Sequence, residues 1–276
     1  MGSRYRRQIR AAQSTGVAGP PLSCCASCGG APATGLQACA SCKVVAYCSP
    51  ACQRAHRVAH RKPCKAVAAA QFDRALADAS AGDSTAQAAV GSAYQHGLGV
   101  HKSLADAIIW YTRAAEAGNV DAQFNLGCLY SSGTGVIDDA AQAAVWYERA
   151  AAGGDVGAHY NLANLLARGR GVPRDPVRAA ALYRHAAEAG HAGAQHCLAL
   201  CHLHGAGTLE DDAEALFWFR RAADAGEASA QCCLGLLYAK GDCGLACDMS
   251  QAAAFLRQAA AGGSVDAADA LVCYGL

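Results

Sequence analysis

Residues 119–154 read NVDAQFNLGCLYSSGTGVIDDAAQAAVWYERAAAGG, and this stretch recurs along most of the chain. Its closing glycine returns every 36 residues, as Gly118, Gly154, Gly190 and Gly226. Its segment AQFNLGCLY matches AQAAVGSAY, AHYNLANLL, AQHCLALCH and AQCCLGLLY in the neighbouring units. Self-similarity at a fixed period of this length is typical of stacked-repeat proteins.

Each unit predicts a hairpin of two helices. Ala122, Leu126 and Leu129 fall at i, i+4 and i+7, which places them on one face of a first helix. A glycine loop such as SGTGV follows, and AAVWYERAAAGG then forms the second helix. Tryptophan recurs in the second helices with the same period, as Trp110, Trp146 and, after Leu182, Trp218.

Start and stop signals support these helices. Ser103 with Asp106 resembles a capping box, and Asp175 followed by Pro176 is an N-cap with proline at the first helical position. The glycines that end each unit stand where a left-handed residue is needed.

A single hairpin cannot bury its own apolar face, so neighbouring hairpins must stack. We predict a repeat region over 83–276, with five repeats and a partial capping repeat. Its core position is shared by Val90, Leu126, Leu162, Leu198, Leu234 and Leu271. The repeats are 83–118, 119–154, 155–190, 191–226 and 227–263, followed by 264–276. Residues 65–82 are predicted as a linking or capping helix with Phe72, Leu76 and Ala79 on one side.

The recurring elements A-Q-x-x-L-G-x-x-Y, G-x-G-V and W-Y-x-x-A-A-x-x-G resemble the Sel-1-like repeat family, a relative of the tetratricopeptide repeats. The resemblance covers about two thirds of the chain. It implies an all-α protein whose repeats form a right-handed α-solenoid that serves as a scaffold for protein complexes. It implies no chemistry.

Ahead of the repeats, eight candidate metal ligands occur in four pairs. They are Cys25-x2-Cys28, Cys39-x2-Cys42, Cys48-x3-Cys52 and His60-x3-Cys64. A structural zinc ion takes four nitrogen or sulfur ligands, so eight ligands fit two ions. A ligand pair at i, i+4 lies on one face of a helix, and Pro50 and Pro63 suit the start and end of such a helix.

This pattern, with Tyr47-Cys48-Ser49 and Cys52-Gln53, resembles the MYND zinc finger over residues 24–64. In that family the fold is cross-braced, with alternate ligand pairs sharing an ion. The resemblance therefore implies that Cys25, Cys28, Cys48 and Cys52 hold one Zn²⁺, and that Cys39, Cys42, His60 and Cys64 hold a second.

Two residues compete with this assignment. Cys24 adjoins Cys25, and His56 lies four residues from both Cys52 and His60; we favour Cys25 and His60 because they give the family spacing. The family helix also contacts proline-rich peptides and usually carries tryptophan where this chain has Arg57. That departure argues against proline-rich peptides as partners.

The net charge of +1 conceals an asymmetry. The first 72 residues hold ten Lys and Arg and no acidic residue. The rest of the chain holds 13 basic and all 22 acidic residues, which gives it a formal charge of −9. A basic region can bind nucleic acid, but few aromatic side chains lie there for base stacking. We therefore keep a nucleic-acid-associated regulatory protein as an alternative and do not expect nucleic acid as the main partner.

Composition also bears on compartment. The 16 cysteines follow no secretory segment, which favours metal ligands and free thiols in a reducing, intracellular compartment, the cytoplasm or the nucleus. No apolar run reaches the length of a membrane span. Residues 1–23 resemble either a transit peptide or a disordered basic tail, and we favour the tail.

The function predicted is that of a non-catalytic adaptor or scaffold that docks partner proteins on the repeat surface and, as a second route, on the finger. No stretch remains for a catalytic fold, and no nucleophile with a neighbouring base has motif support. An accessory subunit of an enzyme complex is a further alternative. One repeat position varies in chemistry and is a candidate partner surface: His96, Ser132, Arg168, His204 and Lys240.

The remaining cysteines and histidines have simpler interpretations. Cys197, Cys201, Cys232 and Cys233 are predicted to pack as small apolar side chains. The pair Cys243-x3-Cys247 has no partner ligands in the sequence around it. Four histidines, His191, His196, His202 and His204, cluster in the fourth repeat.

Overall fold

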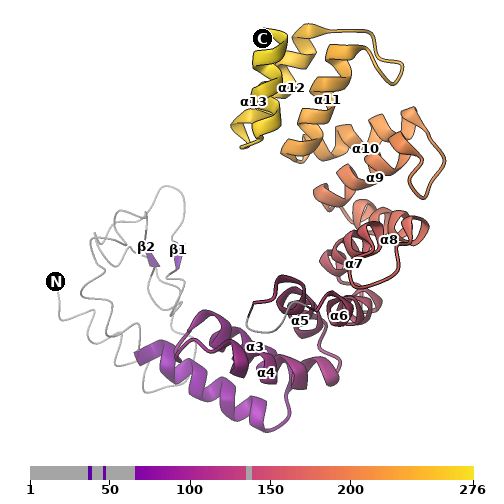
Figure 1. Cartoon of the computed structure of the whole chain (residues 1–276). Coiled ribbons are helices and arrows are strands. Elements are labelled where there is room, and N and C mark those ends of the chain that lie inside the picture. The colour runs from indigo at the N-terminus through magenta and orange to yellow at the C-terminus, as the bar shows by residue number, and fades with distance from the viewer. Residues whose placement is uncertain (1–36, 39–45, 48–65, 135–138) are drawn as a thin grey trace, which may run out of the picture. The chain divides into compact units, whose positions relative to one another are not determined.

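The computed structural model describes residues 37–38, 46–47, 66–134 and 139–276 (Figure 1). The chain divides into two compact units, Met1–Trp110 and Tyr111–Leu276. In the first unit, strands β1 (Gln37–Ala38) and β2 (Ala46–Tyr47) pair antiparallel, with Gln37 opposite Tyr47. A helix then covers residues 66–80.

The described residues that follow are helical hairpins, as the repeats predict. Their first helices are α3 (Ser84–His96), α5 (Val120–Ser132), α7 (Val156–Arg168), α9 (Ala192–His204) and α11 (Ala228–Lys240). Their second helices are α4 (Leu104–Glu116), α6 (Ala140–Ala152), α8 (Pro176–Glu188), α10 (Asp212–Asp224) and α12 (Met249–Ala261). Helix α13 (Val265–Tyr274) is a further first helix. In the second unit, α5 to α13 pack in chain order, each against the next (Figure 1).

The helices begin and end at the residues that the sequence singles out. Asp175 accepts a hydrogen bond from the backbone N–H of Arg178, and Pro176 takes the first turn of α8. Asp139, Asp211 and Asp248 cap α6, α10 and α12 in the same way. The repeat-ending glycines are left-handed, with φ between 85° at Gly226 and 92° at Gly263 in the second unit. The predicted N-cap at Asp175 and the glycine stops are therefore confirmed.

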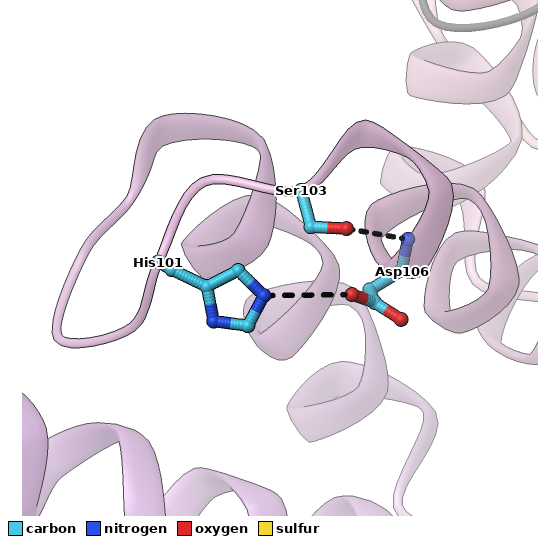
Figure 2. A network of polar contacts seen from close by, with 3 residues as sticks. All are labelled: His101, Ser103 and Asp106. Carbon is cyan, nitrogen blue, oxygen red and sulfur yellow. Dashed lines mark hydrogen bonds and ion pairs between the residues drawn. The ribbon is translucent and has the colours of Figure 1, made fainter.

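Only one of the two hydrogen bonds of the predicted capping box forms at the start of α4. The backbone N–H of Asp106 donates to Oγ of Ser103 at 3.2 Å, as Figure 2 shows. The Asp106 carboxylate faces Nε2 of His101 at 4.0 Å instead of reaching back to Ser103 (Figure 2). The reason is that the backbone N–H of Ser103 already donates to the carbonyl of Tyr94 at 3.0 Å.

The predicted core position is buried in all five full repeats. Each of its side chains is at most 1% exposed: Val90, Leu126, Leu162, Leu198 and Leu234. Leu271 is the exception, because it is only half-buried in α13. Among the described helices α13 packs mainly on α11 and α12, so one side of Leu271 lacks the following hairpin that the other repeats supply.

In the first unit the helix at 66–80 packs on the first repeat. Phe72 and Ala79 are buried in one cluster with Val90, and Leu76 packs against it. The ring of Phe72 meets that of Tyr94 edge-on, with centroids 5.3 Å apart. This helix therefore lies in the place of a second helix ahead of the first repeat.

In four of the five full repeats a glutamine joins the first helix to the helix before it. Its Nε2 donates to a backbone carbonyl eight residues earlier, at 3.0–3.1 Å: Gln87 to Ala79, Gln123 to Ala115, Gln195 to Ala187 and Gln231 to Ala223. The third repeat has His159 at this position, and its Nδ1 bonds to the carbonyl of Asp155 at 2.8 Å. The junction between the second and third repeats therefore lacks the glutamine bond.

The second glycine of the loop lets successive hairpins approach closely. A methyl group added to Gly207 would lie 2.0 Å from the carbonyl oxygen of Pro176, at the start of the preceding second helix. A methyl group on Gly171 would lie 2.4 Å from the carbonyl carbon of Ala140. No side chain fits there, so the stacking itself requires glycine.

Candidate functional site

The predicted zinc ligands lie outside the described residues. This holds for Cys25, Cys28, Cys48 and Cys52 as for Cys39, Cys42, His60 and Cys64. The described part of this region is the β1–β2 pair, and Cys39 and Cys48 directly follow the two strands in sequence. The donor set, seven thiols and one imidazole, has the chemistry that structural zinc prefers, and it leaves no oxygen donor for an ion such as Mg²⁺.

The variable repeat position is exposed in every repeat, as expected of a surface that partners could reach. His96, Ser132, Arg168, His204 and Lys240 each stand at the end of a first helix, one residue before a left-handed glycine. Cationic side chains at a helix C-terminus also interact favourably with the helix dipole. These five residues are therefore equivalent exposed positions whose chemistry changes from one repeat to the next.

The histidines of the fourth repeat do not form one site. His191 caps α9, with Nδ1 accepting from the N–H of Ala194 at 3.1 Å. His202 is buried and its Nε2 lies 3.1 Å from the guanidinium of Arg184. His196 faces Cys233, its Nε2 3.7 Å from the thiol, and burial lowers the pKa of His196. The sequence proximity of these histidines reflects three separate packing roles.

Four cysteines of the second unit behave as apolar side chains. Cys201 and Cys232 are buried, and Cys197 and Cys233 are half-buried. Burial raises the pKa of Cys201 and of Cys233 to about 11, so both stay protonated at neutral pH. A protonated thiol is neither a nucleophile nor a metal ligand.

The irregular loop of the fifth repeat holds no metal site within the described structure. Burial, followed by Asp212, raises the pKa of Cys243 to about 11, and Cys247 donates to the carbonyl of Ala239. In residues 66–134 and 139–276, no group of three His, Cys, Asp or Glu side chains is placed to hold a metal ion.

Arginine side chains lie over aromatic rings on the second helices. The guanidinium carbon of Arg149 lies 4.8 Å from the ring of Trp146. That of Arg221 lies 5.3 Å from Trp218 and 5.8 Å from Phe217. These pairs were not anticipated from the sequence, although the four-residue and three-residue spacings on one helix could have indicated them.

The fold and the described surface define a class of protein: stacked helical hairpins that follow a small cysteine-rich finger. The Sel1 repeat model matches residues 84–119, 120–155, 156–191, 192–227 and 228–264, and the MYND finger model matches residues 25–64. The chain therefore belongs to the Sel1 repeat family and carries a MYND zinc finger ahead of its repeats.

Two solved structures resemble the chain closely. One is c5321 of uropathogenic Escherichia coli, described as a protective antigen with an SLR fold, at 32% identity and a TM-score of 0.70 over 79% of this chain. The other is a Sel1 repeat protein from Oxalobacter formigenes, at 34% identity and a TM-score of 0.64 over 67% of this chain and 73% of its own. The match covers 47% of the E. coli protein. No curated protein matches the sequence.

The described helices include none that is both long enough and apolar enough to cross a membrane.

Proposed function

We propose that this protein is a zinc-binding adaptor that docks partner proteins on the surface of its helical repeats. One observation carries the proposal: the repeats keep their interior constant and vary their exterior. The core position is at most 1% exposed in each of the five repeats, and four of them share the glutamine bond. The equivalent exposed position at the end of each first helix changes from histidine to serine, arginine and lysine.

This pattern fits a scaffold better than an enzyme. Catalysis needs convergent groups in one place, whereas a stack of equivalent hairpins presents an extended surface with one set of side chains per repeat. The buried cysteines and histidines of the second unit are used in packing. An accessory role in an enzyme complex is compatible with the same surface, because docking is then the contribution of this chain.

For the finger we propose two Zn²⁺ ions, one on Cys25, Cys28, Cys48 and Cys52 and one on Cys39, Cys42, His60 and Cys64. Four protein ligands fill a tetrahedral shell, so each ion would act as a structural cross-link with no open position for a substrate. We further propose residues 24–64 as the finger domain, 65–82 as the linking helix and 83–276 as the repeat domain, in a reducing intracellular compartment.

Metal analysis tests the finger directly. We expect about two zinc ions per chain in protein purified with reductant, since eight ligands complete two shells. Cys42→Ser should lose the second ion, because three remaining ligands bind weakly. Ser92→Ala, an exchange in the repeats, is the control and should keep both ions. A stoichiometry near one ion in the unaltered protein contradicts the two-ion assignment.

Affinity purification tests the adaptor function and divides it between the two parts. The full chain and residues 66–276 are used as baits under identical conditions. Partners that bind both baits are assigned to the repeats, and partners lost with the finger are assigned to the finger. A reproducible catalytic turnover that disappears on exchange of one polar cluster overturns the adaptor proposal.

The nucleic-acid alternative rests on the charge of the first 72 residues. Seven thiolates on two Zn²⁺ ions would offset part of that positive charge. Filter binding of an oligonucleotide over a range of salt concentrations separates the two functions, because phosphate contacts give a steep salt dependence.

A further inference from the structure

The third repeat differs in charge from all the others. Residues 155–190 hold five arginines and three acids, a formal +2, whereas the other four full repeats are each negative, between −1 and −3. The arginines are Arg168, Arg170, Arg174, Arg178 and Arg184, and all five are exposed. An acidic stack of repeats thus carries one cationic section.

The fold concentrates three of these arginines at the loop between α7 and α8. Arg168 is the last residue of α7, and Nε of Arg174 donates to the carbonyl of Ala167 beside it at 3.2 Å. The loop turns back on itself so tightly that a methyl group on Gly169 would lie 3.1 Å from Cβ of Arg174. Arg170 stands between them in sequence and donates to the carbonyl of Ser131 at 3.0 Å. Like charges are held together here at a cost in repulsion.

Two carboxylates of this region form hydrogen bonds elsewhere. Asp175 accepts from the backbone N–H of Arg178 at 2.9 Å and caps α8. Glu148 of α6 accepts from the guanidinium of the same Arg178 at 2.8 Å. Neither acid pairs with Arg168 or Arg174 through these bonds.

Apolar side chains protrude in the same region. Val177, in the first turn of α8, is 67% exposed. The loop of the fourth repeat packs on this turn, because Gly207 meets the backbone of Pro176 and Val177. Leu209, two residues further along that loop, is 88% exposed. Guanidinium groups and aliphatic side chains are therefore presented together at the start of α8.

From this arrangement we infer that the third repeat docks an acidic segment of a partner protein, with carboxylates on Arg168 and Arg174 and an apolar side chain on Val177. The inference rests on the proposed adaptor function and names its partner chemistry. Guanidinium forks bind carboxylates in two-pronged geometry, and the apolar contact favours a peptide over a phosphate backbone. The acidic repeats on both sides repel the same segment, which restricts it to this position.

The test is fluorescence anisotropy with the full chain, loaded with zinc, and three labelled probes. The probes are a glutamate-rich peptide with interspersed leucines, the same peptide with lysine for glutamate, and a single-stranded oligonucleotide. We expect the glutamate peptide alone to bind, more weakly as salt screens the charges. The variant Arg168→Glu/Arg174→Glu should bind it at least about tenfold more weakly.

The matched control is Arg220→Glu/Arg257→Glu, which changes the net charge by the same amount through exposed residues of the fourth and fifth repeats that have no assigned binding role. It should alter the affinity by less than about twofold, because these charges are largely screened from the third repeat. Val177→Ser should weaken binding without changing its salt dependence. Circular dichroism checks that all variants keep their helical signal.

Each other outcome overturns the inference. No binding of the glutamate peptide, or equal loss in both double variants, removes the third repeat as the site. Tighter binding of the oligonucleotide, lost in Arg168→Glu/Arg174→Glu, assigns the site to nucleic acid. If partners from affinity purification still bind that variant, the adaptor function stands and this surface is wrong.

Discussion

Replacing Gly207 with alanine should destabilise the stack far more than the same change at Gly226. Both glycines are left-handed, with φ of 82° and 85°, so alanine costs about 1–2 kcal/mol of backbone strain at either position. At Gly226 nothing lies within 4 Å of the added methyl group. At Gly207 the methyl group would lie 2.0 Å from the carbonyl oxygen of Pro176, and that atom belongs to the backbone of α8.

The backbone of α8 must therefore move, and overpacking of this kind costs roughly a further 1–3 kcal/mol. We expect Gly207→Ala to lose about 2–5 kcal/mol and Gly226→Ala about 1–2 kcal/mol. Urea unfolding followed by the helical circular dichroism signal compares the two variants under identical conditions. Equal losses would show that strain alone explains both, and that the close approach of loop and helix is absent in solution.

Three further predictions concern the core, the repeat junction and the thiols. Leu162→Asp should lower the free energy of unfolding by at least about 3 kcal/mol, because it buries an unpaired carboxylate. Leu209→Asp, at an exposed loop position, should leave the urea midpoint unchanged. Equal effects of the two variants would show that the core face has been assigned wrongly. His159→Gln should gain about 0.5–1.5 kcal/mol by restoring the missing junction bond, and a loss would refute that role. In iodoacetamide labelling at neutral pH, followed by peptide mass spectrometry, the exposed Cys273 should react before Cys201. Burial raises the pKa of Cys201 to about 11, so its thiolate becomes abundant only near that pH, and fast labelling at pH 7 would contradict its burial.

The hairpins could be predicted from the sequence because local signals agree with the repeat period. Glycine, proline and aspartate mark the helix ends, and Leu126 and its equivalents mark the core face. Each of these signals acts within one repeat, so it can be recognised in the sequence without knowing how the repeats stack.

The contacts between repeats could not be predicted in this way. Gln123, Gln195 and Gln231 are polar residues that a sequence places at the surface, yet each is at most 9% exposed. Their bonding partners are carbonyls at the end of the preceding helix, and only the stacked geometry brings the two together. Leu271 differs in the opposite direction: it is apolar and was predicted to be buried, yet it is only half-buried. Its full burial would need a neighbour that the described helices do not supply.

The candidate sites divide in the same manner. The zinc ligands follow from spacing and from the family resemblance, and they remain predictions because they lie outside the described residues. The excess of arginine in the third repeat could have been found by counting the charged residues of each repeat. Its convergence on one loop depends on the turn at Gly169, which the sequence alone does not reveal.

The histidine at position 159 has a consequence for how the second unit comes apart. In a linear array each repeat is stabilised by its neighbours, so cooperativity is transmitted through the junctions. Where the glutamine bond is missing, one of these links is lost, and we expect thermal opening to begin between α6 and α7 while the blocks on either side stay folded. We therefore expect the second unit to unfold as two cooperative segments that meet between α6 and α7, and the arginine-bearing loop lies just beyond that junction.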